Sequence, residues 1–171
     1  LRVFGKGPAV ATLLCDLAKG VLAVVICRLV VTNGFGVTFF HDDKFIGYLA
    51  GFFVMLGHIF PVFYGFHGGK GVLIAATTLI AIDPLTCVFS VAVFAIVLAA
   101  TKYVSVGSIC AAIAYPVFTP IVQLFIIKGD GVLANTLMAS AIGLLIIYMH
   151  RPNIKRLMNG TENKFGSKKK A

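Results

Sequence analysis

The stretch VFSVAVFAIVLAA (Val88–Ala100) decides the fold class, because it is apolar on every side. A strand of a membrane-spanning β-barrel would alternate polar and apolar residues over about ten positions, and this stretch does not. The whole chain shares its character, since 59% of the 171 residues are hydrophobic, 12% are charged and the mean hydropathy is +0.98. Soluble domains carry charge on about a quarter of their residues. We therefore predict an all-α fold, a polytopic helical bundle in a membrane.

Further apolar segments on both sides of this stretch are candidates for crossing a hydrocarbon core, which takes roughly 20 residues. Segment 72–82 is too short to cross unaided and ends at a predicted turn, Asp83-Pro84. Pro116 and Pro120 predict a kink in a later span, because each removes a backbone hydrogen bond. The predicted spans are 8–31, 45–64, 85–100, the apolar segment from the break TKYVSVGS (101–108) to Ile127, and 132–149.

The basic residues gather on one face of the membrane if segment 72–82 is counted as a full crossing. The opposite face then has only Lys44 and Lys128, diluted by Asp42, Asp43 and Asp130. The positive-inside rule places the basic face in the cytoplasm, together with a basic tail from about residue 150. A re-entrant segment would instead separate this tail from Lys70. The basic face carries Arg2, Lys6, Lys70, Lys102, Arg151, Lys155, Arg156, Lys164 and Lys168 to Lys170.

Two other interpretations of the sequence are disfavoured. The net charge of +9 does not indicate a nucleic-acid partner, because no water-exposed region is long enough to present a basic face. The cysteines lie within apolar segments and lack the spacing of metal ligands, so we predict packing residues rather than a metal site or disulfides. They are Cys15, Cys27, Cys87 and Cys110.

A glycine-rich, basic gap, YGFHGGKGV (Tyr64–Val72), interrupts the apolar pattern. It is not a Walker A loop, which needs a glycine at position 64 and Ser or Thr after the lysine. Its three glycines after His67 would let backbone N–H groups approach an anion, and Lys70 and the following helix N-terminus would add positive charge. The other interpretation is a flexible interfacial turn whose lysine faces lipid headgroups.

The tail begins with HRPNIKRLMNGTE (His150–Glu162), directly after a predicted span. Its arginines could bind anionic lipid and fix orientation. That explanation gives no reason for His150 and Asn153, whose value lies in directed hydrogen bonds. Arg2 would add a bidentate oxyanion ligand on the same face.

These segments resemble the bacterial PlsY family of integral-membrane acyltransferases. FHGGKGV (66–72) and HRPNIKRLMNGTE (150–162) are similar to two of its signature motifs. LRVFGKGPAVATLLCDLAKG (1–20), GHIFPVFYGF (57–66) and YVSVGSI (103–109) fit the family in the same order. The family's first motif begins with a Ser-Gly-Asn-type stretch that follows another membrane helix. We therefore expect a fragment of one transmembrane acyltransferase domain, truncated at its N-terminus.

The resemblance implies acyl transfer from an acyl phosphate to the primary hydroxyl of glycerol 3-phosphate. The products would be lysophosphatidic acid and inorganic phosphate, made for phospholipid synthesis at the bacterial inner membrane. It implies no ATP, coenzyme A, metal or other cofactor, and it makes an acyl-phosphate-forming enzyme a candidate partner. The implied catalytic residues are Arg2, Lys70, His150 and Asn153. The implied phosphate-binding residues are Gly68, Gly69, Gly71, Ser105, Arg151 and Arg156.

The identity of the group that accepts the hydroxyl proton stays open between two routes. His150 could be the general base for the attacking hydroxyl. Alternatively, His150 and Asn153 position glycerol 3-phosphate while a phosphate oxygen of the acyl donor takes the proton, which is the route attributed to the family. Glu162 would orient a basic neighbour or lie solvated in the tail.

Three titratable residues inside the predicted spans, Asp16, Lys19 and His58, carry specific predictions. Asp16 and Lys19 are three residues apart, so we predict an ion pair on one helix face, with positioning of the Arg2 loop as an alternative role. His58 is predicted to be a satisfied core histidine.

Two other function classes compete with the enzyme. An anion transporter or channel would need basic residues through the bilayer, whereas the basic residues gather at one face. An inactive structural subunit is the third interpretation, because the first residues of the family's first motif are absent from this sequence.

Overall fold

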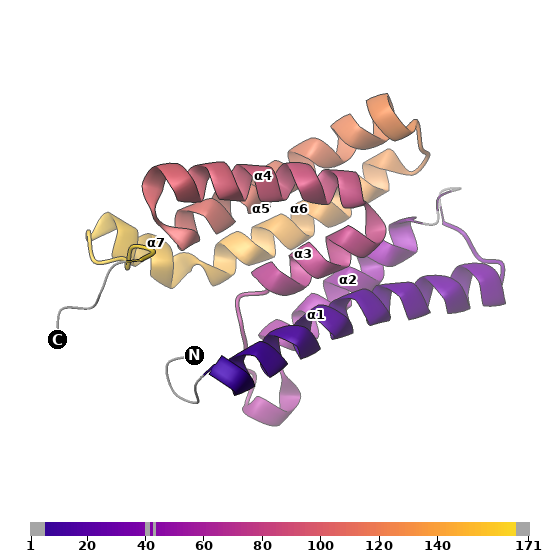
Figure 1. Cartoon of the computed structure of the whole chain (residues 1–171). Helices are drawn as coiled ribbons and strands as arrows, with labels where there is room; N and C mark the ends of the chain where they lie inside the picture. Colours follow the sequence, from indigo (N-terminus) through magenta and orange to yellow (C-terminus); the bar gives the residue numbers. More distant parts are fainter. Residues whose placement is uncertain (1–5, 40–41, 43, 167–171) are drawn as a thin grey trace. The chain divides into compact units, whose positions relative to one another are not determined.

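The computed structural model, which describes residues 6–39, 42 and 44–166, confirms the all-α fold (Figure 1). Apart from a single bridge between Phe39 and Asp42, every regular element described is a helix. Five helical segments are long and apolar enough to cross a membrane, and α3 is a shorter apolar helix. The elements are α1 (Lys6–Arg28), η1 (Leu29–Gly34), α2 (Lys44–Ile59), η2 (Val62–Tyr64), α3 (Val72–Ile82), α4 (Pro84–Thr101), α5 (Val104–Ile121), η3 (Val122–Ile127), α6 (Val132–Met149) and α7 (Arg151–Met158).

The chain divides into two compact units, residues 1–84 and 85–171. In the first unit, α1, α2 and α3 pack on one another through small residues. A methyl group on Gly20 would collide with Thr77 Oγ1, and one on Gly51 would lie 3.1 Å from Thr78 Cβ. Close approach of this kind stabilises membrane helices, because packing rather than apolar burial holds them together.

In the second unit, α5 and α6 pack closely, and a methyl group on Gly143 would collide with the carbonyl oxygen of Ala112. The rings of Phe89 and Phe118 stack at 5.2 Å and join α4 to α5. The second unit thus holds its helices together by the same close contacts as the first.

Several boundaries differ from the sequence-based prediction. The predicted break at 101–108 is only two residues long, because α5 already begins at Val104. Its serines do not end the helix, since the Ser108 hydroxyl donates to the carbonyl of Val104 at 3.0 Å. The first span continues as a π-helix to Gly34 rather than ending at residue 31.

Pro84 lies at a position that helices tolerate well, whereas two other prolines lie inside a helix. Pro84 opens α4, and the non-helical Asp83 before it (φ −145°, ψ 81°) separates α3 from α4, as the predicted turn requires. Pro116 and Pro120 instead lie inside α5, and the helix changes to π geometry at Val122. The kink itself stays a prediction.

Candidate active site

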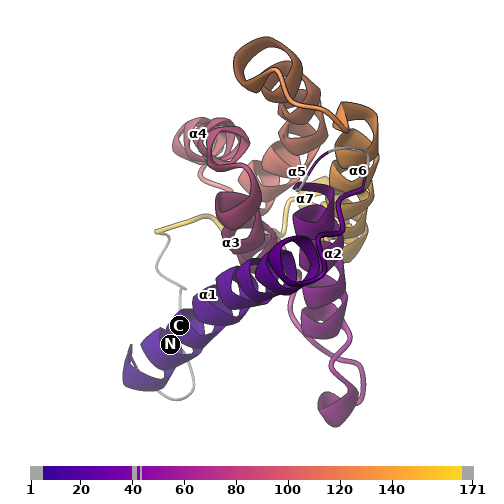
Figure 2. The same ribbon diagram turned by 90° about the vertical axis from the view of Figure 1, so that its right-hand side faces the viewer.

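The glycine-rich segment folds back onto the end of α2. The η2 turn projects beyond α2 (Figure 2), and the chain returns through Gly65, which has a positive φ of 60°. The N–H of Gly68 then donates to the carbonyl of Ile59 at 3.0 Å, and that of Gly69 to the carbonyl of His58 at 3.3 Å. These bonds satisfy carbonyls that the helix end leaves without partners.

Steric contact explains why two positions of the loop are occupied by glycine. A Cβ on Gly68 would collide with the His58 carbonyl oxygen, and one on Gly69 would collide with Nε2 of the His58 ring. Gly71 has φ +79°, where a side chain is strained, and it caps the start of α3. The glycines therefore hold the loop against α2, and approach of a phosphate to them stays a prediction.

Lys70 lies in this loop with an exposed side chain. It stands one residue before Gly71, whose carbonyl accepts the N–H of Ala75 at 2.8 Å in the first turn of α3. The first N–H groups of a helix have no partner within it and carry partial positive charge. A lysine beside such a helix end is chemically suited to hold a phosphate group.

Asp16, Lys19 and His58 form a polar cluster between α1 and α2. Asp16 and Lys19 make the predicted ion pair, with Oδ1 and Nζ 2.6 Å apart. His58 is satisfied, as predicted, but its partner is Lys19 Nζ, 3.0 Å from Nδ1. It is not a core residue, since 18% of its side chain is exposed.

In the second unit, His150 occupies the corner between α6 and α7 with only 2% of its surface exposed. Its Nδ1 lies 2.8 Å from the carbonyl oxygen of Ile146. A carbonyl only accepts hydrogen bonds, so Nδ1 carries the hydrogen and Nε2 is the nitrogen that can accept one. This tautomer can accept a hydrogen bond from a substrate hydroxyl.

Glu162 connects two of the predicted site residues. Its Oε1 accepts a hydrogen bond from Asn153 Nδ2 at 2.8 Å, and its Oε2 accepts one from Arg156 Nε at 2.6 Å. The Glu162 side chain is 8% exposed and that of Arg156 is 43% exposed, so the carboxylate is largely shielded from water while the guanidinium is not. Of the two alternatives left open for Glu162, the structure therefore supports the one in which it orients a basic neighbour.

The network changes the acidity of Glu162. Burial by itself would raise the pKa of its carboxyl. Hydrogen bonds from Asn153 and Arg156, the nearby hydroxyl of Ser105 and the charge of Arg156 outweigh burial, so the pKa lies below its ordinary value of 4.5. Glu162 is therefore a carboxylate at neutral pH.

Two buried polar atoms beside this carboxylate lack a hydrogen-bond partner. The Ser105 hydroxyl lies near Glu162 without completing a hydrogen bond, and Asn153 Oδ1 is likewise unsatisfied. Ser105 and Asn153 are 5% and 4% exposed. Buried polar atoms are normally paired, so these two are suited to receive a polar ligand.

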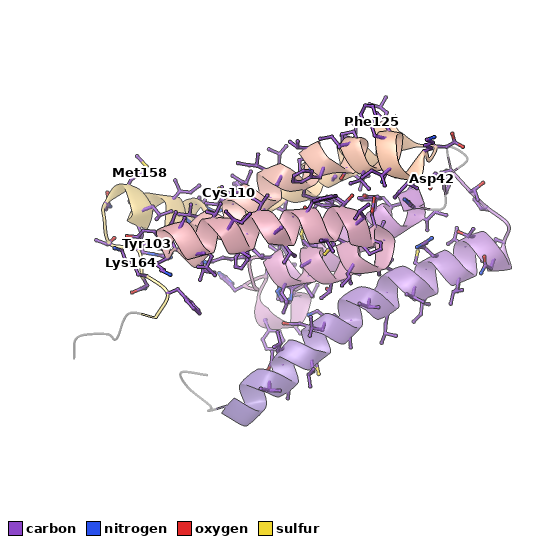
Figure 3. All side chains as sticks on the ribbon, turned by 45° about the horizontal axis from the view of Figure 1, so that its top comes forward. Asp42, Tyr103, Cys110, Phe125, Met158 and Lys164 are labelled. Atoms are coloured by element: carbon purple, nitrogen blue, oxygen red, sulfur yellow. The ribbon has the colours of Figure 1, made fainter. Side chains whose placement is uncertain are left out.

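The remaining tail residues make separate contacts. Arg151 is exposed, and its guanidinium carbon lies 4.3 Å from the centre of the Tyr148 ring. Lys164 lies 5.7 Å from the centre of the Tyr103 ring (Figure 3), and the N–H of Phe165 donates to the carbonyl of Lys102 at 2.7 Å. The tail is thereby held on the turn between α4 and α5.

The structure thus brings Ser105, Asn153 and Arg156 together around Glu162. His150 lies at the start of α7, the helix that carries Asn153 and Arg156. Arg2 lies outside the described residues. In residues 6–39, 42 and 44–166, no three His, Cys, Asp or Glu side chains cluster closely enough to hold a metal ion.

The sequence analysis did not identify Glu162 as a site residue, although a local pattern indicated that the chain turns back before it. Asn159-Gly160 is a turn dipeptide, and Gly160 has φ +66°. A turn there reverses the chain and returns Glu162 to Arg156. For His58, no local signal pointed to Lys19, which lies 39 residues earlier.

Known proteins similar to this chain decide its family. A family model described as glycerol-3-phosphate acyltransferase matches residues 1–160. The chain belongs to the glycerol-3-phosphate acyltransferase family. The PlsY resemblance is thereby confirmed, and this acyltransferase is a multi-pass integral membrane enzyme that produces lysophosphatidic acid.

Individual relatives agree with this assignment. The acyltransferase is 41% identical to the glycerol-3-phosphate acyltransferase of Clostridioides difficile (strain 630), over 99% of this chain and 76% of that protein. It is 39% identical to the one from Shouchella clausii (strain KSM-K16), over 98% of this chain and 77% of that protein.

Two crystal structures of PlsY (YgiH), an integral membrane glycerol 3-phosphate acyltransferase, are similar to the acyltransferase fold. The glycerol 3-phosphate form has a TM-score of 0.74 and 36% identity, covering 96% of this chain and 74% of that one. The lysophosphatidic acid form has the same TM-score and 35% identity, covering 96% of this chain and 76% of that one.

Proposed function

We propose that the acyltransferase takes its acyl group from an acyl phosphate. The primary hydroxyl oxygen of glycerol 3-phosphate attacks the carbonyl carbon, and the bond from that carbon to the phosphate oxygen breaks. The hydroxyl proton leaves with inorganic phosphate, so the reaction balances without another reactant. The observation that carries the acceptor and product is the similarity to PlsY in its glycerol 3-phosphate and lysophosphatidic acid forms.

The chemistry of the two units supports a division of roles. Lys70 and the N-terminus of α3 bind a substrate phosphate and offset its charge. Ser105 and Asn153 Oδ1 offer buried polar atoms to a substrate, and Arg156 is held in place by Glu162. Arg151 and Arg2 are proposed as further phosphate ligands.

The test of this function is acyl transfer with defined substrates. Purified protein is incubated with palmitoyl phosphate and labelled glycerol 3-phosphate, without coenzyme A or ATP, beside a Lys70→Ala variant. Labelled lysophosphatidic acid that is lost in the variant supports the proposal. No product, with phosphate flux across liposomes instead, contradicts it in favour of a transporter.

We propose that the proton passes to the leaving phosphate and that His150 Nε2 positions the attacking hydroxyl. Gln at position 150 keeps an acceptor near that nitrogen without its basicity. His150→Gln should therefore keep kcat within about tenfold of the parent, whereas loss of a general base costs roughly 10²–10⁴-fold. Rates of both proteins over a range of pH decide between the two routes. A fall in kcat of roughly 10²–10⁴-fold would contradict proton transfer to the leaving phosphate.

We propose that the glycine loop and the tail lie on the cytoplasmic side, as the distribution of basic residues predicts. This requires α3 to cross, although eleven residues span only about 16 Å at 1.5 Å per residue. Single cysteines replacing Phe63 and Lys155 in a cysteine-free protein should react with a membrane-impermeant maleimide only in inverted vesicles. Reaction of the two from opposite sides would mean that α3 is re-entrant.

A further inference from the structure

The cluster of Asp16, Lys19 and His58 has no part in the proposed reaction. Lys19 Nζ lies 2.6 Å from Asp16 Oδ1 and 3.0 Å from His58 Nδ1. Asp16 Oδ1 is 3.7 Å from that ring nitrogen, beyond hydrogen-bond range. The side chains therefore act in the order Asp16, Lys19, His58.

This order determines the tautomer of His58. An ammonium group only donates hydrogen bonds, so Nδ1 of His58 must accept one from Lys19. In the neutral ring the hydrogen is then on Nε2. Asp16 holds the ammonium, and the ammonium fixes the orientation of the imidazole.

His58 also touches the glycine loop at two points. Its backbone carbonyl accepts the N–H of Gly69 at 3.3 Å. Its ring lies against Gly69, where a Cβ would collide with Nε2 and come within 3.1 Å of Cδ2 and Cε1. The position of the imidazole thus limits where Gly69, and with it Lys70, can lie.

We infer that Asp16, Lys19 and His58 are positioning residues for the loop that carries Lys70. They hold the loop in the conformation that receives a phosphate group, from either glycerol 3-phosphate or the acyl phosphate. The inference rests on the proposed function. A cluster that only neutralises charge in the membrane would have no reason to be packed against Gly69.

Single variants of the cluster separate positioning from general stability. His58→Ala and Lys19→Met should each raise KM for one phosphate substrate roughly fivefold or more while kcat changes less than about threefold. The substrate whose KM rises identifies the phosphate that the loop binds. Lys19→Arg keeps a hydrogen-bond donor and the positive charge, so its KM should stay close to that of the parent. Equal KM values in all these proteins would overturn the inference.

The sharper test combines His58→Ala with Gly69→Ala. The three nearest atoms to a Cβ at Gly69 all belong to the His58 ring, so removing the ring makes room for the methyl group. Gly69→Ala alone should lower kcat/KM at least about tenfold, and the double variant should be no worse than His58→Ala. Additive losses would refute the packing role of His58.

Gly68→Ala is the matched control. Its Cβ would meet the carbonyl oxygens of His58 and Ile59, which no side-chain change removes. Adding His58→Ala to Gly68→Ala should therefore not recover kcat/KM. A recovery of kcat/KM in that double variant would contradict the specific contact between the His58 ring and Gly69.

A readout without catalysis separates this inference from the proposed function. Thermal unfolding and calorimetric binding of glycerol 3-phosphate are measured for four proteins: the parent, His58→Ala, Gly69→Ala and the double variant. Coupling in binding, with no turnover of palmitoyl phosphate by the parent, supports the inference and contradicts the proposed donor. Turnover without coupling in either measurement overturns the inference alone.

Discussion

Replacing Lys70 by alanine is expected to lower kcat/KM for acyl transfer by roughly 10²–10³-fold, about 2.7–4 kcal/mol of transition-state stabilisation. The lysine is exposed at the N-terminus of α3, where it adds a full charge to the partial charge of the helix end. A phosphate held there loses its charged partner in the variant. The measurement is initial rates with both substrates varied.

Two further variants control this prediction. Lys70→Arg keeps the charge but changes its shape, so it should retain part of the activity. Lys128→Ala removes another exposed lysine, which is predicted for the opposite membrane face, and should keep the parental rate. A Lys70→Ala protein with nearly full activity would remove Lys70 from the phosphate site.

Replacing Glu162 by alanine is expected to destabilise the protein by about 2–4 kcal/mol and to abolish most of its activity. The change removes the acceptor of two hydrogen bonds, from Asn153 at 2.8 Å and Arg156 at 2.6 Å. The lower part of the range allows for the Arg156 side chain, which is 43% exposed and regains water. Thermal unfolding in detergent and acyl transfer are the two measurements.

The pH dependence of stability distinguishes the ionised network from simple packing. Because the pKa of Glu162 is lower in the folded protein, its carboxylate stabilises the fold above its ordinary value of 4.5. That contribution is lost as the pH falls through the lowered folded-state value. Glu162→Gln should remove this part of the acid dependence, and the exposed Asp130→Ala should not. A Glu162→Gln protein with parental stability at neutral pH would contradict the network.

The sequence predicted most of the helices, because membrane spans are recorded in composition and length. Every backbone polar group in lipid must be paired within the protein, and a helix pairs these groups within a single segment, so a long run that is apolar on every side indicates a helix. The predicted helix boundaries were wrong where polar residues lie near a helix end. Ser108 suggested a break, but it bonds to the carbonyl of Val104 inside α5. The tail helix α7 was missed because its residues are basic and polar.

The candidate site was predicted by residue type and only partly by arrangement. The motifs identified Lys70, His150 and Asn153 as groups able to bind or orient a phosphate ester. They did not say which partner each side chain would have. Arg156 is held by Glu162, whereas Arg151 lies on the ring of Tyr148, and nothing in their spacing separates these two environments.

The sequence by itself determined that this chain is a membrane helical protein with a basic, glycine-containing loop and a polar tail motif. Those properties depend on composition and on short local patterns. Only the tertiary structure decided that His58 joins Lys19 to Gly69 and that Glu162 joins Asn153 to Arg156. Such contacts depend on how helices and turns place distant residues, and a difference of an ångström decides whether a hydrogen bond forms.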